Sequence, residues 1–149
     1  MKIAIGADHG GFGLKEEIKK YLDENGYEVK DFGTYSTDSC DYPDYGLQVA
    51  EAVAAKEYEF GILVCGTGIG IGIAANKVPG IRAALCSDTF SAHATREHND
   101  ANILTMGARV VGPGLALDIV KTFLNAKFEG DRHVRRLNKI SEIEKKYSK

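Results

Sequence analysis

The sequence has few cysteines, no basic excess and no long apolar run. Three cysteines in 149 residues are too few for a disulfide-stabilised secreted scaffold, and the odd number leaves at least one thiol free. A formal net charge of −2 gives no basic field of the kind that nucleic-acid-binding domains carry. The longest segment without a charged side chain, residues 60–76, contains five glycines and is shorter than a membrane-spanning helix requires.

These absences favour a cytoplasmic protein with reduced thiols and with neither a membrane nor a nucleic acid as partner. The apolar run at the amino terminus is too short for the core of a signal peptide. The length predicts a single domain over residues 1–149, because domains usually span about 100–200 residues. A domain of this size buries enough surface to fold without disulfides.

Short apolar segments alternate with amphipathic segments along the whole chain. Repeated β–α units of this length require parallel strands with crossover helices. We therefore predict a Rossmann-like, three-layer α/β/α sandwich with about five parallel strands and an extra carboxyl-terminal helix. Strands are expected at residues 2–7, 27–32, 60–65, 81–86 and 103–106, and helices at 12–25, 43–56, 68–76, 88–99, 113–126 and 132–147.

Glycine is the residue type in excess, and its positions are informative. Eight of the 17 glycines fall within residues 6–13 and 66–72, at or directly after the ends of two of the expected strands. Ligands of such sheets bind outside the carboxyl ends of the strands, where glycine loops present backbone N–H groups to anions. We favour an anion or oxyanion site over loops that only make tight turns.

Known phosphate loops do not match these segments. No Walker A sequence is present, and the dinucleotide fingerprint is absent after the first strand. A variant fingerprint at residues 70–75 begins inside an expected helix and follows the wrong strand. We predict no nicotinamide or other cofactor.

Cys65 ends the third expected strand, beside the start of a helix, where a thiolate is favoured. No arginine closes the loop that follows, so a cysteine phosphatase is not indicated. Cys40 lies in a polar loop and Cys86 ends the fourth expected strand. Both are interpreted as having no special chemistry.

The histidines give no metal-binding pattern. His93 and His98 are five residues apart, which does not place two ligands on one helical face, and no cysteine–histidine spacing indicates zinc. We predict no metal. His98 and Asn99 end an expected helix, and His9 follows Asp8 in the first glycine loop. His98 and His9 therefore lie on segments that are candidates for the binding site.

Arg132 and Arg136 are four residues apart, on one face of the last helix. Their planar guanidinium groups suit a phosphate dianion. A nucleic-acid-binding helix and a merely solvated charged helix are the alternatives.

A thiolate base, an oxyanion loop, a histidine acid and phosphate-binding arginines together suit proton transfer next to a sugar-phosphate carbonyl. Removal of a C2 proton from an aldose gives a cis-enediolate, whose charge preorganised N–H donors stabilise.

Five segments resemble one family closely and in order. They are GADHGGFGLKEEI (residues 6–18), DYPDYG (41–46), CGTGIGIGIAANKVPGIRAALC (65–86), REHNDANILTMGAR (96–109) and FEGDRHVRRLNKI (128–140). The chain resembles the type B ribose-5-phosphate isomerases, a family that includes allose-6-phosphate and galactose-6-phosphate isomerases. The resemblance implies interconversion of ribose 5-phosphate and ribulose 5-phosphate.

By the same resemblance, Cys65 is the base that takes the C2 proton, Thr67 assists proton movement between O1 and O2, and His98 assists opening of the furanose ring. A non-catalytic phosphosugar-binding module, or an allose- or galactose-6-phosphate isomerase, remains the alternative. The implied substrate-binding positions are Asp8, His9, Tyr42, Gly66, Gly68, Ile69, Gly70, Asn99, Arg109, Arg132 and Arg136.

The family's subunits form dimers whose active sites combine residues of both chains, so the resemblance implies a homodimer with shared sites and leaves a tetramer open. The segment carrying His98, Asn99 and Arg109 is then expected to serve the neighbouring site. Two departures stand out: Gly72 replaces an expected serine, and Asp131 replaces an expected glycine.

Overall fold

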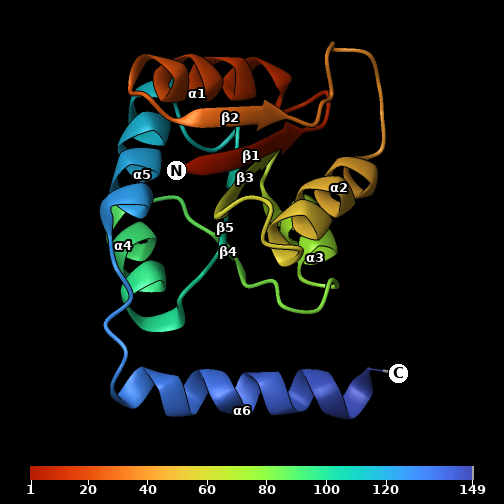
Figure 1. Ribbon diagram of the computed structural model, residues 1–149. Coiled ribbons are helices and arrows are strands. Elements are labelled where there is room, and N and C mark those ends of the chain that lie inside the picture. Colours follow the sequence, from red (N-terminus) through yellow and green to blue (C-terminus); the bar gives the residue numbers. More distant parts are fainter. Residues whose placement is uncertain (149) are drawn as a thin grey trace.

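Five strands form one parallel sheet in the order β2-β1-β3-β5-β4 in the computed structural model, which describes residues 1–148 (Figure 1). The predicted parallel sheet is therefore confirmed. The strands are β1 (Lys2–Ala7), β2 (Glu28–Asp31), β3 (Phe60–Cys65), β4 (Ala83–Leu85) and β5 (Ile103–Gly107).

Helices cover both faces of the sheet, which confirms the three-layer sandwich (Figure 1). Side chains alternate along each strand, so Ile3 and Ile5 enter the core beneath one group of helices and Ala4 enters the core on the other face. The first face carries α1 (Phe12–Glu24), α4 (Thr89–Asn99) and α5 (Pro113–Asn125), and the second carries α2 (Tyr42–Ala54) and α3 (Ile69–Ala75).

Element boundaries differ from the sequence prediction mainly at the sheet edge. β4 has three residues rather than six; it lies at the edge of the sheet and pairs with β5 alone. Asp88 caps the start of α4: its Oδ1 accepts a 2.7 Å hydrogen bond from the Ser91 N–H.

The strand order defines where a ligand crevice forms. From β1 the chain moves outward to β2, whereas β3 lies on the other side of β1. The connections after β1 and β3 lead to α1 and α3, on opposite faces of the sheet. In sheets of this kind ligands bind at such a switch point, outside the carboxyl ends of the strands, and both glycine loops lie there.

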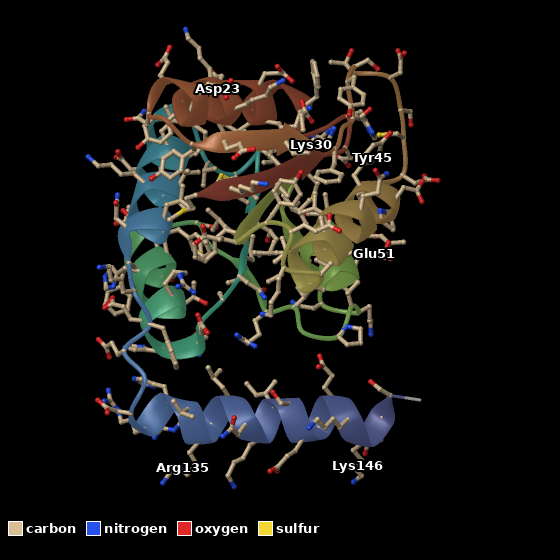
Figure 2. The ribbon with its side chains drawn as sticks, in the orientation of Figure 1. Asp23, Lys30, Tyr45, Glu51, Arg135 and Lys146 are labelled. Carbon is tan, nitrogen blue, oxygen red and sulfur yellow. The ribbon has the colours of Figure 1, made fainter. Side chains whose placement is uncertain are left out.

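The predicted last helix, α6 (Arg132–Tyr147), extends outside the sandwich (Figure 1). Arg135 and Lys146 project from it away from the rest of the molecule (Figure 2). It is attached at one end through buried His133, and near the other through Glu144, whose carboxylate accepts a 3.1 Å hydrogen bond from the Gly80 N–H. Among residues 1–148, no helix is long and apolar enough to cross a membrane.

Candidate active site

The loops after β1 and β3 lie directly against each other. The Asp8 N–H donates to Val64 O at 3.3 Å, and Asp8 Oδ1 accepts from the Gly11 N–H at 3.1 Å. A Cβ on Gly11 would lie only 2.2 Å from Val64 O, so this approach needs glycine. Asp8 is thereby held, 7% exposed, beside the end of β3.

Cys65 is the last residue of β3, and its thiol lies against the following loop. The Gly68 N–H donates to Cys65 Sγ at 3.0 Å. Gly68 has a φ of 80°, a left-handed conformation that glycine adopts without strain. The Thr105 hydroxyl fixes this residue further by donating to Gly68 O at 2.9 Å. The backbone of the glycine loop thus fixes the position of the Cys65 thiol.

Thr67, in the same loop, is exposed and has its hydroxyl oriented by the backbone. Its Oγ1 accepts a 3.2 Å hydrogen bond from the Ile69 N–H. Because a hydroxyl has one proton and two lone pairs, this contact leaves the proton of Thr67 free to donate to a bound molecule.

Tyr42 and Arg109 lie over the two outer glycines of the loop. A Cβ on Gly70 would be 2.6 Å from Tyr42 Cζ, and one on Gly66 would be 3.7 Å from Arg109 Nε. The first residue of α2 and the loop after β5 thus border the two ends of the same glycine loop. An aromatic hydroxyl and an exposed guanidinium therefore border the loop that follows Cys65.

His9 faces the long connection between β2 and α2. Its Nδ1 accepts a 3.2 Å hydrogen bond from the Cys40 N–H, and Cys40 Sγ lies 3.9 Å from the same nitrogen. A neutral imidazole that accepts at Nδ1 has its proton on Nε2. This assignment leaves Nε2–H as a donor.

A second group of predicted residues lies far from Cys65. Asn99 O accepts a 2.9 Å hydrogen bond from Arg82 Nε, immediately before β4, at the amino end of the strands. Cys65 pairs with Gly107 at the opposite end, and a strand advances about 3.3 Å per residue. His98 and Asn99 therefore lie across the sheet from the glycine loops, while Arg132 and Arg136 are exposed on α6.

Two residues beside His98 are missed by the sequence analysis. The rings of His98 and His133 stack with centroids 4.7 Å apart, and Glu129 Oε1 lies 3.9 Å from His98 Nε2 and 3.5 Å from His133 Nε2. These three donor atoms could hold a metal ion. They come from the end of α4, the α5–α6 connection and the start of α6, so spacing within one helix gives no signal.

Lys15 is the other missed residue. Its side chain is fully buried, and its ammonium group donates to both carboxylate oxygens of Asp31 at 2.8 Å and to Thr34 O at 2.7 Å. Burial opposes ionisation of Asp31, but hydrogen bonds from Lys15, the Gly33 N–H and Lys19 outweigh it and lower the pKa of Asp31. Lys15 thus ties α1 to the end of β2 through Asp31, and to the following connection through Thr34 O.

Known proteins resemble the chain over almost its whole length. A model of the ribose/galactose isomerase family matches residues 3–140. Ribose-5-phosphate isomerase B of Escherichia coli is 54% identical over 145 residues, which cover 97% of each chain. The structure of Clostridium thermocellum ribose-5-phosphate isomerase B has 64% identity and a TM-score of 0.99, over 99% of this chain and 100% of that one. D-erythrulose-4-phosphate isomerase of Pectobacterium atrosepticum is 44% identical, over 97% and 95% of the two chains.

Proposed function

The chain belongs to the ribose/galactose isomerase family, and from this premise we propose that it interconverts D-ribose 5-phosphate and D-ribulose 5-phosphate with Cys65 as the base. It is a sugar-phosphate isomerase, an enzyme of the aldose–ketose class. The observation that carries the proposed mechanism is the 3.0 Å hydrogen bond from the Gly68 N–H to Cys65 Sγ, at the carboxyl end of β3.

The reaction moves protons and needs no net oxidant. The Cys65 thiolate takes the C2 proton of the open-chain aldose, and the electron pair of that C–H bond becomes the C1–C2 double bond as O1 takes the negative charge. Donors at residues 66–70 stabilise this enediolate. The free hydroxyl proton of Thr67 suits transfer between O2 and O1, after which the Cys65 thiol returns its proton to C1.

The surrounding side chains suit a phosphosugar. Buried Asp8 and the Tyr42 hydroxyl provide partners for sugar hydroxyls. The Nε2–H of His9 provides one donor to a phosphate, and Arg109, Arg132 and Arg136 provide charge. Ring opening is assigned to His98, with Asn99 as a further contact. Residues 1–149 act as a single cytoplasmic domain in this proposal.

The separation of the two groups within one chain supports a homodimer with shared sites. His98 and Asn99 lie at the amino end of the strands and Cys65 at the carboxyl end, so one substrate molecule cannot contact both groups of the same chain. A neighbouring copy would supply the second group, and a tetramer would pair two such dimers.

Turnover by the pure protein tests the reaction. Ribose 5-phosphate should give ketose, with C2 proton exchange into deuterated solvent, and Cys65→Ala should abolish both while the fold persists. Cys40→Ser serves as the matched thiol control. Absence of ketose formation, with and without added metal, would disprove the proposal. Binding without proton exchange would indicate a non-catalytic phosphosugar-binding module.

A substrate panel tests the alternatives. The relative from Pectobacterium atrosepticum is named for a four-carbon substrate, so erythrulose 4-phosphate is a second candidate. Rates on ribose 5-phosphate, erythrulose 4-phosphate, allose 6-phosphate and galactose 6-phosphate should rank ribose 5-phosphate first. A higher kcat/KM on any other compound would transfer the assignment to it.

Mixing two inactive variants tests the shared site. In a heterodimer of Cys65→Ala and His98→Asn, one site loses both residues and the other keeps both. Random reassortment of dimers should therefore restore about a quarter of the wild-type activity. If each site lies within one chain, the mixture stays inactive.

A further inference from the structure

A cluster of three side chains lies on the side of the molecule away from Cys65. His98 ends α4, Glu129 lies in the α5–α6 connection and His133 belongs to the first turn of α6. One ring nitrogen of each imidazole and a carboxylate oxygen of Glu129 all lie within 4.8 Å of one another. Side chains from three segments thus direct metal-ligand atoms at one point.

His133 provides a second, independent observation. It is 5% exposed, and its Nε2 has no hydrogen-bond partner within the described residues 1–148. The 3.5 Å separation from Glu129 Oε1 does not have the geometry of a hydrogen bond. A buried ring nitrogen without a partner is costly, and here it is directed at the other two potential ligands.

We propose that His98, Glu129 and His133 form a Zn²⁺ site. Two imidazoles and one carboxylate are a donor set that zinc takes, with water in the fourth position. Zinc–ligand bonds of about 2.0–2.1 Å give ligand–ligand separations of about 3.4 Å in a tetrahedron. The separations of 3.5 and 3.9 Å from Glu129 are close to this value.

Only the His98 ring has to move for the site to close. The two rings stack with centroids 4.7 Å apart and an interplanar angle of 24°, so no ion can lie in the plane of both rings and within bonding distance of both. The His98 side chain is 43% exposed and that of His133 only 6%. Rotation of His98 therefore opens the stack and directs its Nε2 at the ion, while His133 stays fixed.

Occupancy of this site has a consequence that rests on the proposed function. A zinc ion on His98 Nε2 takes the lone pair through which that ring would exchange a proton with the sugar ring oxygen. Zinc should therefore inhibit the enzyme when its substrate is the cyclic form of ribose 5-phosphate.

Calorimetric titration of the metal-free full-length protein with ZnCl₂ tests the site itself. We expect one zinc per chain, no binding of Mg²⁺, and binding at least about tenfold weaker in Glu129→Gln and in His133→Gln, because each loses a ligand. Co²⁺ in place of Zn²⁺ should give the visible absorption of a tetrahedral site. Glu129 is 44% exposed, so its variant tests the site without disturbing the core.

His93→Gln is the matched control, because His93 and Glu97 form another histidine–glutamate pair on α4. Its zinc affinity should equal that of the wild type. Unchanged zinc affinity in Glu129→Gln, or loss of affinity in His93→Gln alone, would overturn the proposal.

Activity measurements separate this proposal from the proposed function. Zinc should inhibit the wild type at concentrations that leave Glu129→Gln active, whereas zinc bound to the Cys65 thiol would inhibit both equally and contradict the inhibitory role. If zinc binds through Glu129 and the protein has no isomerase activity, the metal site stands and the proposed function fails.

Discussion

The backbone N–H of Gly68 donates a 3.0 Å hydrogen bond to the Sγ of Cys65. The donor is oriented by the left-handed backbone of Gly68, with a φ of 80°, and by the Thr105 hydroxyl on its carbonyl oxygen. A hydrogen bond to a charged acceptor contributes about 1.5–3 kcal/mol, so this contact is strongest when the sulfur is a thiolate. The loop conformation and the reactivity of Cys65 are therefore linked.

Gly68→Ala should reduce both stability and activity. A Cβ there would lie 2.6 Å from the Met106 carbonyl carbon, and the left-handed conformation costs roughly 1–2 kcal/mol in a residue with a Cβ. Displacement of the N–H from sulfur should lower kcat/KM by about 10–100-fold. Thermal unfolding and steady-state kinetics measure the two effects.

Gly114→Ala is the control for this loop substitution. Gly114 is exposed in α5, and a Cβ there would meet no atom within 4 Å. The stability of Gly114→Ala should equal that of the wild type or be slightly higher, and its kcat/KM should be unchanged. Wild-type kcat/KM in Gly68→Ala would show that the contact with Cys65 has no part in catalysis.

The three thiols should differ sharply toward iodoacetamide at about pH 8. Burial, aided by the nearby Asp88 carboxylate, raises the pKa of Cys86 to about 11, so almost no thiolate forms there. Cys40 is half-buried beside His9. Cys65 is 5% exposed, at the end of β3 against the glycine loop where the substrate is proposed to bind. Mass spectrometry should find label on Cys40 and Cys65 and none on Cys86 until the protein is unfolded.

Ribose 5-phosphate should slow the labelling of Cys65 in the folded protein. It should not change the labelling of Cys86 once the protein has been unfolded, which serves as the control. Native Cys86 labelled as fast as Cys40 would contradict the burial that raises its pKa. Equal labelling of Cys65 with and without substrate would argue against its place in the site.

The sequence predicts the central strands well because the physics there is local. Residues 2–7 and 60–65 are short apolar runs, and both strands have these bounds in the structure. β4 is shorter than its apolar run because an edge strand pairs on one side only. The strand order depends on long-range packing, so it cannot be read from periodicity.

The candidate site is predictable only in part for the same reason. Cys65 and its glycine loop lie in one segment, so their arrangement follows from the sequence. The contacts of Glu129 and His133 with His98 join three elements, and the full burial of Lys15 depends on Asp31, which is 16 residues away. Contacts between residues this far apart in the sequence become visible only in the folded structure.

Asp31→Asn should destabilise the protein markedly. It leaves the buried Lys15 ammonium with only the partly exposed Glu16 carboxylate, 3.3 Å away, as a charged partner. Breaking a buried ion pair costs up to about 3–5 kcal/mol. Glu28→Gln is the control, because the Lys2–Glu28 pair is exposed and 3.9 Å long, and it should cost under about 1 kcal/mol. Urea unfolding measures both, and equal losses would contradict the argument.

The pH dependence of stability provides a second test of Asp31. Its pKa in the folded protein is lower than the ordinary value of 3.8, since the contacts of Lys15, Gly33 and Lys19 outweigh desolvation. The folded state then keeps the carboxylate ionised at pH values where the unfolded chain binds a proton. This stabilisation is present above pH 3.8 and is lost as the pH falls through the folded pKa. The free energy of unfolding of Asp31→Asn should therefore fall less between about pH 4 and lower pH values than that of the wild type.

Asp131→Gly should stabilise the protein and strengthen phosphate binding. Asp131 precedes α6 with φ 48° and ψ −124°, a region that favours glycine and costs other residues roughly 1–2 kcal/mol. The greater freedom of glycine in the unfolded chain offsets about 0.5–1 kcal/mol of this gain. Removing a carboxylate next to Arg132 should also lower the KM for ribose 5-phosphate, most clearly at low ionic strength.

Asp131→Asn separates the two effects, because it removes the charge and keeps the Cβ. It should share the lower KM of Asp131→Gly without its full gain in stability. A drop in the unfolding temperature of Asp131→Gly would show that the backbone at residue 131 is not strained. A KM unchanged in both variants would place the phosphate beyond the reach of residue 131, and so argue against Arg132 as one of its contacts.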